Sequence, residues 1–227
     1  PKNFINVVGI EPSDASKHIK QRRVKLINKF FNSQSVNKYL ENFDKPKIIT
    51  ITNVLAQIND LNEFAYSLHN IASKESLIVI EFPYLLDMIN KSLFDLIYHE
   101  HLSYFSLTPL KFLFEKFAIK IVDFEKLNMG ASGPAIRLFL AKYNSNHQIS
   151  SKVKKQIKYE KNWGVHKIRR YQLFQKNVNL KIKKIKKIIY LKYHKGFKLG
   201  CFTAPSKGNT LLNCLSLKKK VIEFASE

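Results

Sequence analysis

Over the first 143 residues, short apolar runs rich in Val and Ile alternate with stretches in which apolar residues recur at helical spacing. Such runs are typical of buried strands, and the spacing is typical of amphipathic helices. We expect strands at residues 6–10, 24–30, 47–52, 77–81, 119–124 and 136–140, and helices at 61–72 and 109–117, with another beginning at 13–15. Strands separated by crossover helices predict an α/β fold with a mostly parallel sheet covered on both faces.

The pattern changes to helix alone between residues 150 and 193. Ile182, Ile185 and Ile189 recur at helical spacing, and Lys fills most of the positions between them. Residues 198–203 then resemble a strand, 205–209 a loop, 210–217 a helix and 221–224 another strand. This order predicts the start of a second α/β unit. Because the chain opens on a strand without an initiator Met and stops after one strand-helix-strand, we expect an internal piece of a longer protein.

Charge is the unusual feature of the composition. The chain has 227 residues and a net charge of +22, with 39 Lys and Arg against 17 Asp and Glu. Residues 151–198 hold 15 Lys and 2 Arg against one acid, Glu160, so most of the excess lies there. This distribution raises nucleic acid as a partner, particularly because Tyr159, Trp163, Tyr171 and Phe174 interleave with the basic residues. It fits equally well the solvated face of a packed helix.

Composition also excludes several classes of protein. No run approaches the roughly 20 apolar residues of a membrane-spanning helix, and the first residues lack a signal-peptide core, so we expect a cytoplasmic protein with no membrane partner. Only Cys201 and Cys214 are present, which rules out a disulfide framework or a four-cysteine zinc site within these residues. We therefore expect no metal site in this chain.

One stretch of the chain gathers several proton-transfer groups. Residues 98–101 read Tyr-His-Glu-His, and Tyr104 follows closely. Imidazole is suited to general base chemistry near neutral pH. The alternatives are a solvated loop or a pair of metal ligands, for which no third ligand is evident. If a strand runs here, Tyr98 and Glu100 share one face and His99 and His101 the other.

Three other places carry candidate binding residues. Glu11 follows the first strand, where an acid can accept the hydroxyls of a ribose, although acids are common at strand ends. Residues 130–137 combine small residues with Arg137, which can bind a phosphate or carboxylate, and a plain tight turn explains them equally well. Residues 204–210 (Ala-Pro-Ser-Lys-Gly-Asn-Thr) form a strand-to-helix turn in which backbone amides and Lys207 can converge on a phosphate.

Together these motifs resemble one family, the S-adenosylmethionine-dependent C-methyltransferases that act on nucleotide-linked keto-deoxysugars. The resemblance runs in order along almost the whole chain and is most specific in the Tyr-His-Glu-His and Ala-Pro-Ser-Lys-Gly-Asn-Thr stretches. The matching segments are residues 9–13, 30–31, 53–61, 81–85, 94–105, 130–137 and 204–213.

The resemblance implies a domain organisation. Residues 1–145 would form a Rossmann-like class I methyltransferase domain, 146–195 a basic helical connector, and 196–227 the start of a carboxy-terminal nucleotide-sugar-binding domain. The glycine turn of the cofactor site, and a zinc-binding module that would hold the only zinc, are expected before Pro1. No statement on oligomeric state follows.

The resemblance also implies roles for individual residues. His101 would be the base that removes a proton next to the sugar ketone, with Tyr98 and Glu100 orienting it or binding the sugar. Glu11 and Asn53 would hold S-adenosylmethionine. The residues implied for the nucleotide sugar are Tyr84, Arg137, Ser206, Lys207, Asn209 and Thr210.

This chain departs from the family pattern at two places. Gln57 stands where many members carry a histidine, and an amide cannot titrate. The turn at Gly130 is longer than the Gly-Gly-Ser form typical of the family. Methylation of an oxygen or a nitrogen of another small acceptor is therefore the alternative within the enzyme class, and a basic nucleic-acid-binding module is the alternative from another class.

Overall fold

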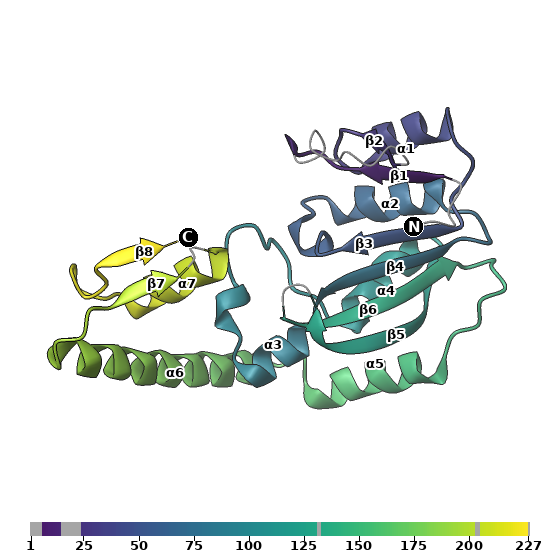
Figure 1. Ribbon diagram of the computed structural model, residues 1–227. Coiled ribbons are helices and arrows are strands. Elements are labelled where there is room, and N and C mark those ends of the chain that lie inside the picture. The colour runs from purple at the N-terminus through teal and green to yellow at the C-terminus, as the bar shows by residue number, and fades with distance from the viewer. Residues whose placement is uncertain (1–5, 15–23, 131–132, 203–204, 227) are drawn as a thin grey trace.

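A computed structural model describes residues 6–14, 24–130, 133–202 and 205–226 of the chain (Figure 1). The structure is a mixed α/β fold, as predicted. Its amino-terminal elements are β1 (Val7–Ile10), β2 (Val24–Ile27), α1 (Ser33–Leu40), β3 (Ile48–Thr52), the 3-10 helix η2 (Leu55–Gln57), α2 (Leu61–Ile71), β4 (Leu77–Pro83), α3 (Leu85–Lys91) and the 3-10 helix η3 (Phe94–Leu96). They are followed by α4 (Leu107–Lys116), β5 (Ile119–Gly130), β6 (Gly133–Lys142), α5 (Ser151–Trp163), α6 (Ile168–His194), β7 (Gly200–Phe202), α7 (Ser206–Leu215) and β8 (Phe224–Ser226).

The main sheet has the order β3-β4-β6-β5. Strands β3 and β4 are parallel, as the crossover helix between them predicts, whereas β6 runs antiparallel to both β4 and β5. The antiparallel part differs from the expected parallel arrangement. Only two residues separate β5 from β6, and a parallel crossover needs about a dozen or more, so these strands form a hairpin.

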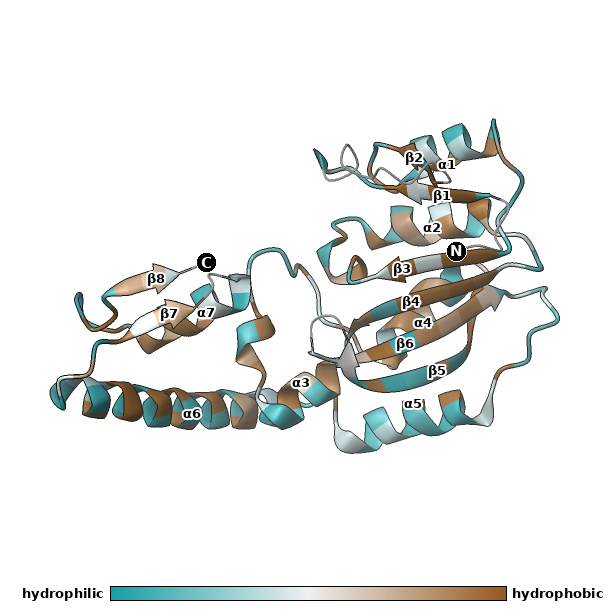
Figure 2. Ribbon diagram, viewed as in Figure 1, coloured by the Kyte–Doolittle hydropathy of each residue, from teal (hydrophilic) through white to brown (hydrophobic). Residues whose placement is uncertain are grey.

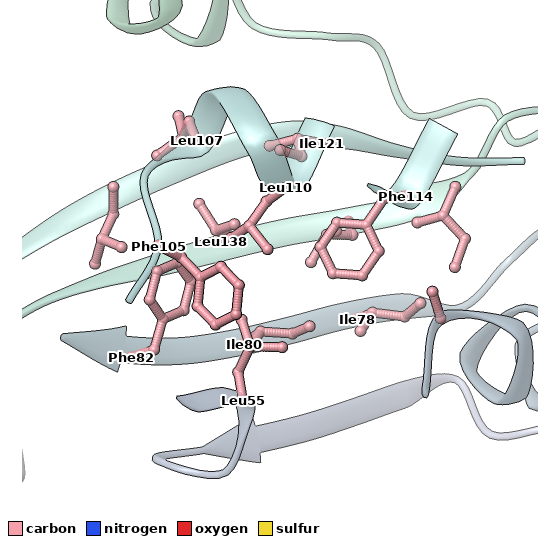
Figure 3. Packing of buried hydrophobic residues seen from close by; sticks show 14 of the residues in the cluster. Leu55, Ile78, Ile80, Phe82, Phe105, Leu107, Leu110, Phe114, Ile121 and Leu138 are labelled. Carbon is pink, nitrogen blue, oxygen red and sulfur yellow. The ribbon is translucent and has the colours of Figure 1, made fainter. Parts of the chain in front are cut away.

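One face of this sheet carries the main hydrophobic core. Ile78 and Ile80 of β4 and Leu138 of β6 point to the same face because alternate residues of a strand share a side. Helices α2 and α4 cover this face with side chains such as Phe64 and Phe114, and Figure 3 shows part of the packing. The opposite face is more open than predicted, since Ile48 is 55% exposed.

Strands β1 and β2 form a separate parallel pair. Val36 and Tyr39 of α1 pack with Ile27 of β2 and Ile71 of α2 in a second, smaller cluster. Asn32 caps helix α1: its side chain accepts from the Ser35 amide, and the Ser35 hydroxyl accepts from the Asn32 amide. This capping box satisfies backbone groups that the helix leaves free.

The basic helical stretch consists of two helices with different surroundings. Gly164, at φ 86°, ends α5, and α6 begins a few residues later. Val153, Ile157 and Trp163 of α5 pack against the core of the main sheet. Helix α6 instead extends away from the sheet and supports β7, α7 and β8 (Figure 1).

The second α/β unit is present as predicted, with β7 parallel to β8 and α7 between them. The helix begins earlier than predicted: Ser206 to Asn209 form its first turn rather than a loop. The helix expected to begin at 13–15 lies largely outside the described residues, as does the centre of the turn at 130–137. No helix that the structure describes is long and apolar enough to cross a membrane.

Candidate functional site

The Tyr-His-Glu-His segment lies in a loop of residues 97–104, the His101 loop, which is held against the ends of β3 and β4. The His101 amide donates to the Tyr98 carbonyl at 3.0 Å, so the segment forms a turn and not a strand. Beyond the turn, the amides of Leu102 and Ser103 donate to the Ala56 carbonyl after β3, at 2.8 and 3.2 Å. The loop therefore places His101 at the carboxyl edge of the parallel strands, where open α/β sheets bind ligands.

His101 is buried, at 7% exposure, and both of its ring nitrogens have partners. Nδ1 lies 3.0 Å from the Leu96 carbonyl, and Nε2 lies 2.9 Å from the Tyr98 hydroxyl. A carbonyl can only accept, so Nδ1 carries the proton in the neutral ring and Nε2 accepts from Tyr98. This tautomer presents Nε2 as the basic atom.

The surroundings keep His101 unprotonated near neutral pH. Burial lowers the pKa of His101, as does the charge of Lys207, while the Leu96 carbonyl and Glu100 act in the opposite direction. Burial and the charge of Glu100 raise the pKa of Tyr98, so its hydroxyl keeps its proton and donates. A neutral imidazole beside a phenol donor can accept a proton from a neighbouring carbon acid.

The turn separates the four residues of the motif into two pairs. The rings of Tyr98 and His101 face each other with centroids 4.2 Å apart. His99 and Glu100 point outward, with side chains 87% and 50% exposed. His99 Nε2 lies 3.9 Å from Glu100 Oε1. The condition for pairing Tyr98 with Glu100 and His99 with His101 is not met, because the segment is a turn and not a strand.

Tyr104, which the sequence places near the motif without a role, contacts the His101 ring. Its ring meets the His101 ring edge-on at 6.1 Å, and its hydroxyl donates to the Leu96 carbonyl at 3.4 Å. Leu96 thus accepts from both His101 and Tyr104. Tyr104 lies three residues beyond His101, and only the turn brings it back to the imidazole.

The two residues expected to hold the cofactor lie at strand ends. Asn53 follows β3 with φ 56°, and its amide donates to the Glu81 carbonyl of β4 at 2.9 Å. Glu11 follows β1 on the separate two-stranded sheet, and its Oε1 accepts from the Ser13 amide at 2.8 Å. Hydrogen bonds from Ser13 lower the pKa of Glu11, so the carboxylate is ionised and keeps acceptor capacity for a ligand.

Arg137 and Tyr84, both expected to bind substrate, are engaged within the protein. The Arg137 guanidinium donates to Glu81 Oε2 from Nη2 at 2.9 Å and from Nε at 3.2 Å, and its Nη1 lies 3.3 Å from Glu125 Oε2. Tyr84 is fully buried, and its hydroxyl donates to Glu160 Oε1 at 2.7 Å. Burial and the charge of Glu160 raise the pKa of Tyr84 far above its usual range.

The remaining candidates lie in the first turns of α7. This helix packs against η3, the 3-10 helix whose Leu96 carbonyl binds the His101 ring. Ser206, Lys207 and Gly208 contribute the first amides, and Pro205 at the cap position supplies no side-chain acceptor. Thr210 is turned back on the helix, donating to the Ser206 carbonyl at 3.1 Å, and Asn209 is exposed. The structure therefore packs α7, which carries Lys207, against η3 next to the His101 loop, more than 100 residues away in the sequence.

Within the described parts of the chain, no three His, Cys, Asp or Glu side chains form a group that can hold a metal ion. The side chain of His99 is exposed, whereas His101 is buried against Tyr98.

Comparison with known proteins relates this chain to the C-methyltransferases. Residues 130–227 match the family model described as the C-methyltransferase C-terminal domain. The C-methyltransferase NovU of Streptomyces niveus is 26% identical over 222 residues, which cover 97% of this chain and 52% of NovU. The chain thus spans about half the length of this curated relative.

Solved structures with some similarity include two methyltransferases. A SAM-dependent methyltransferase from Anabaena variabilis is 14% identical, with a TM-score of 0.45 over 62% of this chain and 70% of that chain. A SAM-dependent methyltransferase from Thermotoga maritima, described as a possible histamine N-methyltransferase, is 14% identical, with a TM-score of 0.44 over 61% of this chain and 73% of that chain.

Proposed function

We propose, from its relationship to the C-methyltransferases, that this chain belongs to an enzyme that transfers a methyl group to a carbon next to the ketone of a nucleotide-linked deoxysugar. The observation that carries the proposal is the state of His101. Its ring is neutral and buried, its proton is held at Nδ1 by Leu96, and its Nε2 accepts from the Tyr98 hydroxyl, a donor that can turn to a substrate oxygen.

His101 would act as the general base. A carbon next to a ketone becomes nucleophilic only when it loses a proton, and Nε2 would accept that proton. The Leu96 carbonyl would hold the ring in the correct tautomer and stabilise the imidazolium that forms. Tyr98 would shift its hydroxyl from Nε2 to the substrate oxygen on which negative charge develops.

The residues at the strand ends fit S-adenosylmethionine as the methyl donor. An ionised acid such as Glu11 can accept both hydroxyls of a ribose, and Asn53 adds a side-chain amide at the end of β3. When bound, this cofactor supplies an electrophilic methyl group on a sulfonium. The protein's main contribution would be to align the two reactants.

The first turn of α7 supports an anionic substrate. Ser206, Lys207 and Gly208 combine the first amides of a helix with a cation, a combination that favours phosphate. Lys207 also acts electrostatically on His101. A nucleotide sugar has phosphates at one end and a keto sugar at the other, so it would span α7 and the imidazole. Asn209 and Thr210 would add polar contacts at the same helix end.

One experiment tests the base in the whole protein. His101→Ala should abolish exchange of the α-proton of a keto sugar in deuterated water and abolish methyl transfer, while cofactor affinity by calorimetry stays within about twofold. His99→Ala is the matched control, because His99 is exposed and points away. Near wild-type turnover of the His101 variant would overturn the assignment.

The same measurement separates the alternative within the enzyme class. Methylation of an oxygen or nitrogen needs no carbon acid, so methyl transfer without α-proton exchange would favour it.

A nucleic-acid-binding role receives less support, because Trp163 donates to Asn90 and packs on the core, and Tyr171 donates to the Val165 carbonyl. Tight retention of RNA in a filter assay, weakening steeply with salt, would reverse that preference.

A further inference from the structure

A buried carboxylate outside the His101 loop receives hydrogen bonds from two segments that flank the loop. Glu160 of α5 is fully buried. Its Oε1 accepts from the Tyr84 hydroxyl and from the Leu107 amide, both at 2.7 Å. Its Oε2 accepts from the Thr108 amide at 2.9 Å and from the Thr108 hydroxyl. Every partner is a donor, as an ionised carboxylate requires.

Glu160 replaces the missing cap of α4. Ser106 occupies the cap position of this helix but makes no side-chain hydrogen bond to it, and the Ser106 hydroxyl is buried without a partner. Leu107 and Thr108 are the first two residues of α4, and Glu160 accepts from both of their amides. A negative charge at this position also complements the helix dipole. The start of α4 is therefore fixed by a residue more than 50 positions later in the chain.

The same carboxylate fixes the end of β4. Tyr84 follows β4 and forms a bridge with Phe105, the Leu85 amide donating to the Phe105 carbonyl at 3.0 Å. Gln156, one turn before Glu160, donates to the Tyr84 hydroxyl at 2.7 Å. Glu160 thus binds both sides of the bridge, Tyr84 on one segment and Leu107 on the other. The bridge is the anchor of the His101 loop on its carboxy-terminal side.

We propose that Glu160 is a positioning residue for His101, acting through the Tyr84–Phe105 bridge that fixes the end of the loop. Its effect on turnover rests on the proposed function, but its effect on the imidazole does not. Two further anchors hold the loop, the Ala56 carbonyl and the Leu96 carbonyl. Loss of Glu160 releases only the anchor at the α4 side, so the chain folds with a misplaced ring.

The test replaces the acceptor by its neutral isostere. In Glu160→Gln one oxygen becomes an NH2 group that faces donors, so the start of α4 loses an acceptor at Leu107 or at Thr108, whichever way the amide is turned. We expect long-range ¹H–¹⁵N spectra of the imidazoles to show His101 as a mixture of tautomers instead of the single Nδ1–H form. In the whole enzyme we expect kcat to fall by about tenfold or more, with KM changed by less than about twofold.

The matched control is Glu75→Gln, which makes the same chemical change at an exposed loop position. Its spectra and rates should equal those of the parent protein. Thermal melting followed by circular dichroism checks that each variant is folded. If Glu160→Gln does not fold, Tyr84→Phe keeps the carboxylate and removes one donor, and it should change the His101 spectrum in the same direction by a smaller amount.

Two outcomes would overturn the proposal. One is a folded Glu160→Gln protein with an unchanged His101 tautomer and unchanged kcat. The other is an unchanged His101 spectrum in Tyr84→Phe when the glutamine variant is unfolded. A parent protein that exchanges no α-proton of a keto sugar would contradict the proposed function alone, because the imidazole spectra still report on the role of Glu160.

Discussion

The two sides of the candidate site are built differently. The His101 loop rests on the sheet unit, defined as β3 to β6 with α2 to α5, whose core includes fully buried side chains such as Phe64, Tyr84 and Phe114. Lys207 is carried by the arm, defined as α6 to β8. Among the residues that the structure describes in the arm, the buried hydrophobic side chains are Val178, Leu215 and Val221.

This difference matches the demands of the two groups. A base must be held within a fraction of an ångström of its proton, and a dense core with directed hydrogen bonds supplies that precision. A cation that attracts an anionic ligand acts over longer distances and tolerates looser support. Figure 2 shows apolar and polar residues alternating along α6, with further apolar residues on β7 and β8.

The strongest test of the comparison removes one large ring from each unit. Phe82 is 1% exposed and meets Phe105 edge-on at 6.0 Å, whereas Phe202 is 83% exposed. Phe82→Ala should lower the free energy of unfolding by about 3–5 kcal/mol, because it leaves a cavity. Phe202→Ala should change it by less than about 0.5 kcal/mol.

Urea unfolding measures both effects when tryptophan fluorescence is combined with circular dichroism, which also follows the helices of the arm. Trp163 is the single tryptophan and packs against the core of the sheet unit, so its signal reports that unit. Equal losses in the two variants would contradict the difference in packing between sheet unit and arm.

A smaller effect is expected when the partner of His101 Nε2 is removed. Tyr98→Phe keeps the ring that faces the imidazole and deletes the hydroxyl 2.9 Å from Nε2. One hydrogen bond contributes about 0.5–1.5 kcal/mol, so kcat should fall by roughly threefold to tenfold. Tyr143→Phe, at a half-exposed position of the same protein, serves as control and should leave kcat unchanged.

Lys207 allows the coupling between arm and sheet unit to be measured. The charge of Lys207 lowers the pKa of His101, so Lys207→Gln should raise that pKa. Lys184→Gln removes an equal charge from an exposed position on α6 and should leave it unchanged. Imidazole chemical shifts followed against pH give the pKa in each variant. An equal change of the His101 pKa in the two variants would mean that the net charge of the protein, and not the position of α7, sets this pKa.

The smallest expected effect concerns stability in acid. Burial lowers the pKa of His101 in the folded chain, so the unfolded chain binds this proton more readily. The stability that neutral His101 contributes is therefore fully present above its unfolded-state pKa of about 6.5 and is lost as the pH falls through its folded-state pKa. His101→Gln should remove part of this pH dependence, and the exposed His99→Gln should not. Unfolding free energies measured between neutral and mildly acidic pH test the difference; identical slopes would contradict it.

Local signals predicted much of the fold. The apolar runs at 77–81 and 119–124 became β4 and part of β5, and the capped stretch at 61–72 became α2. The direction of β6 was not predicted, because residues 136–141 are continuously apolar except for Arg137, a pattern more typical of a parallel strand buried on both faces. The sequence did not decide between a strand and a turn at residues 98–101, because these four residue types are compatible with both.

The role of Glu160 shows how far composition can mislead. The stretch from 151 to 198 has one acid among 17 basic residues, and charge density alone suggests a solvated face. The one signal in the sequence was the isolation of Glu160, because a single carboxylate among many basic residues suggests a specific hydrogen-bonding role. Which donors it would meet depended on β4 and α4, and the sequence order carries no trace of that contact.

The sequence by itself determined the periodic elements, the charge distribution and the segments that resemble C-methyltransferases, because each of these is a property of neighbouring residues. Only the tertiary structure decided that His101 faces Tyr98 and not Glu100, that Arg137 and Tyr84 are engaged within the protein, and that α7, which carries Lys207, packs against η3. Those outcomes depend on which distant segments meet, and burial and directed hydrogen bonds between such segments set both the geometry and the protonation of the site.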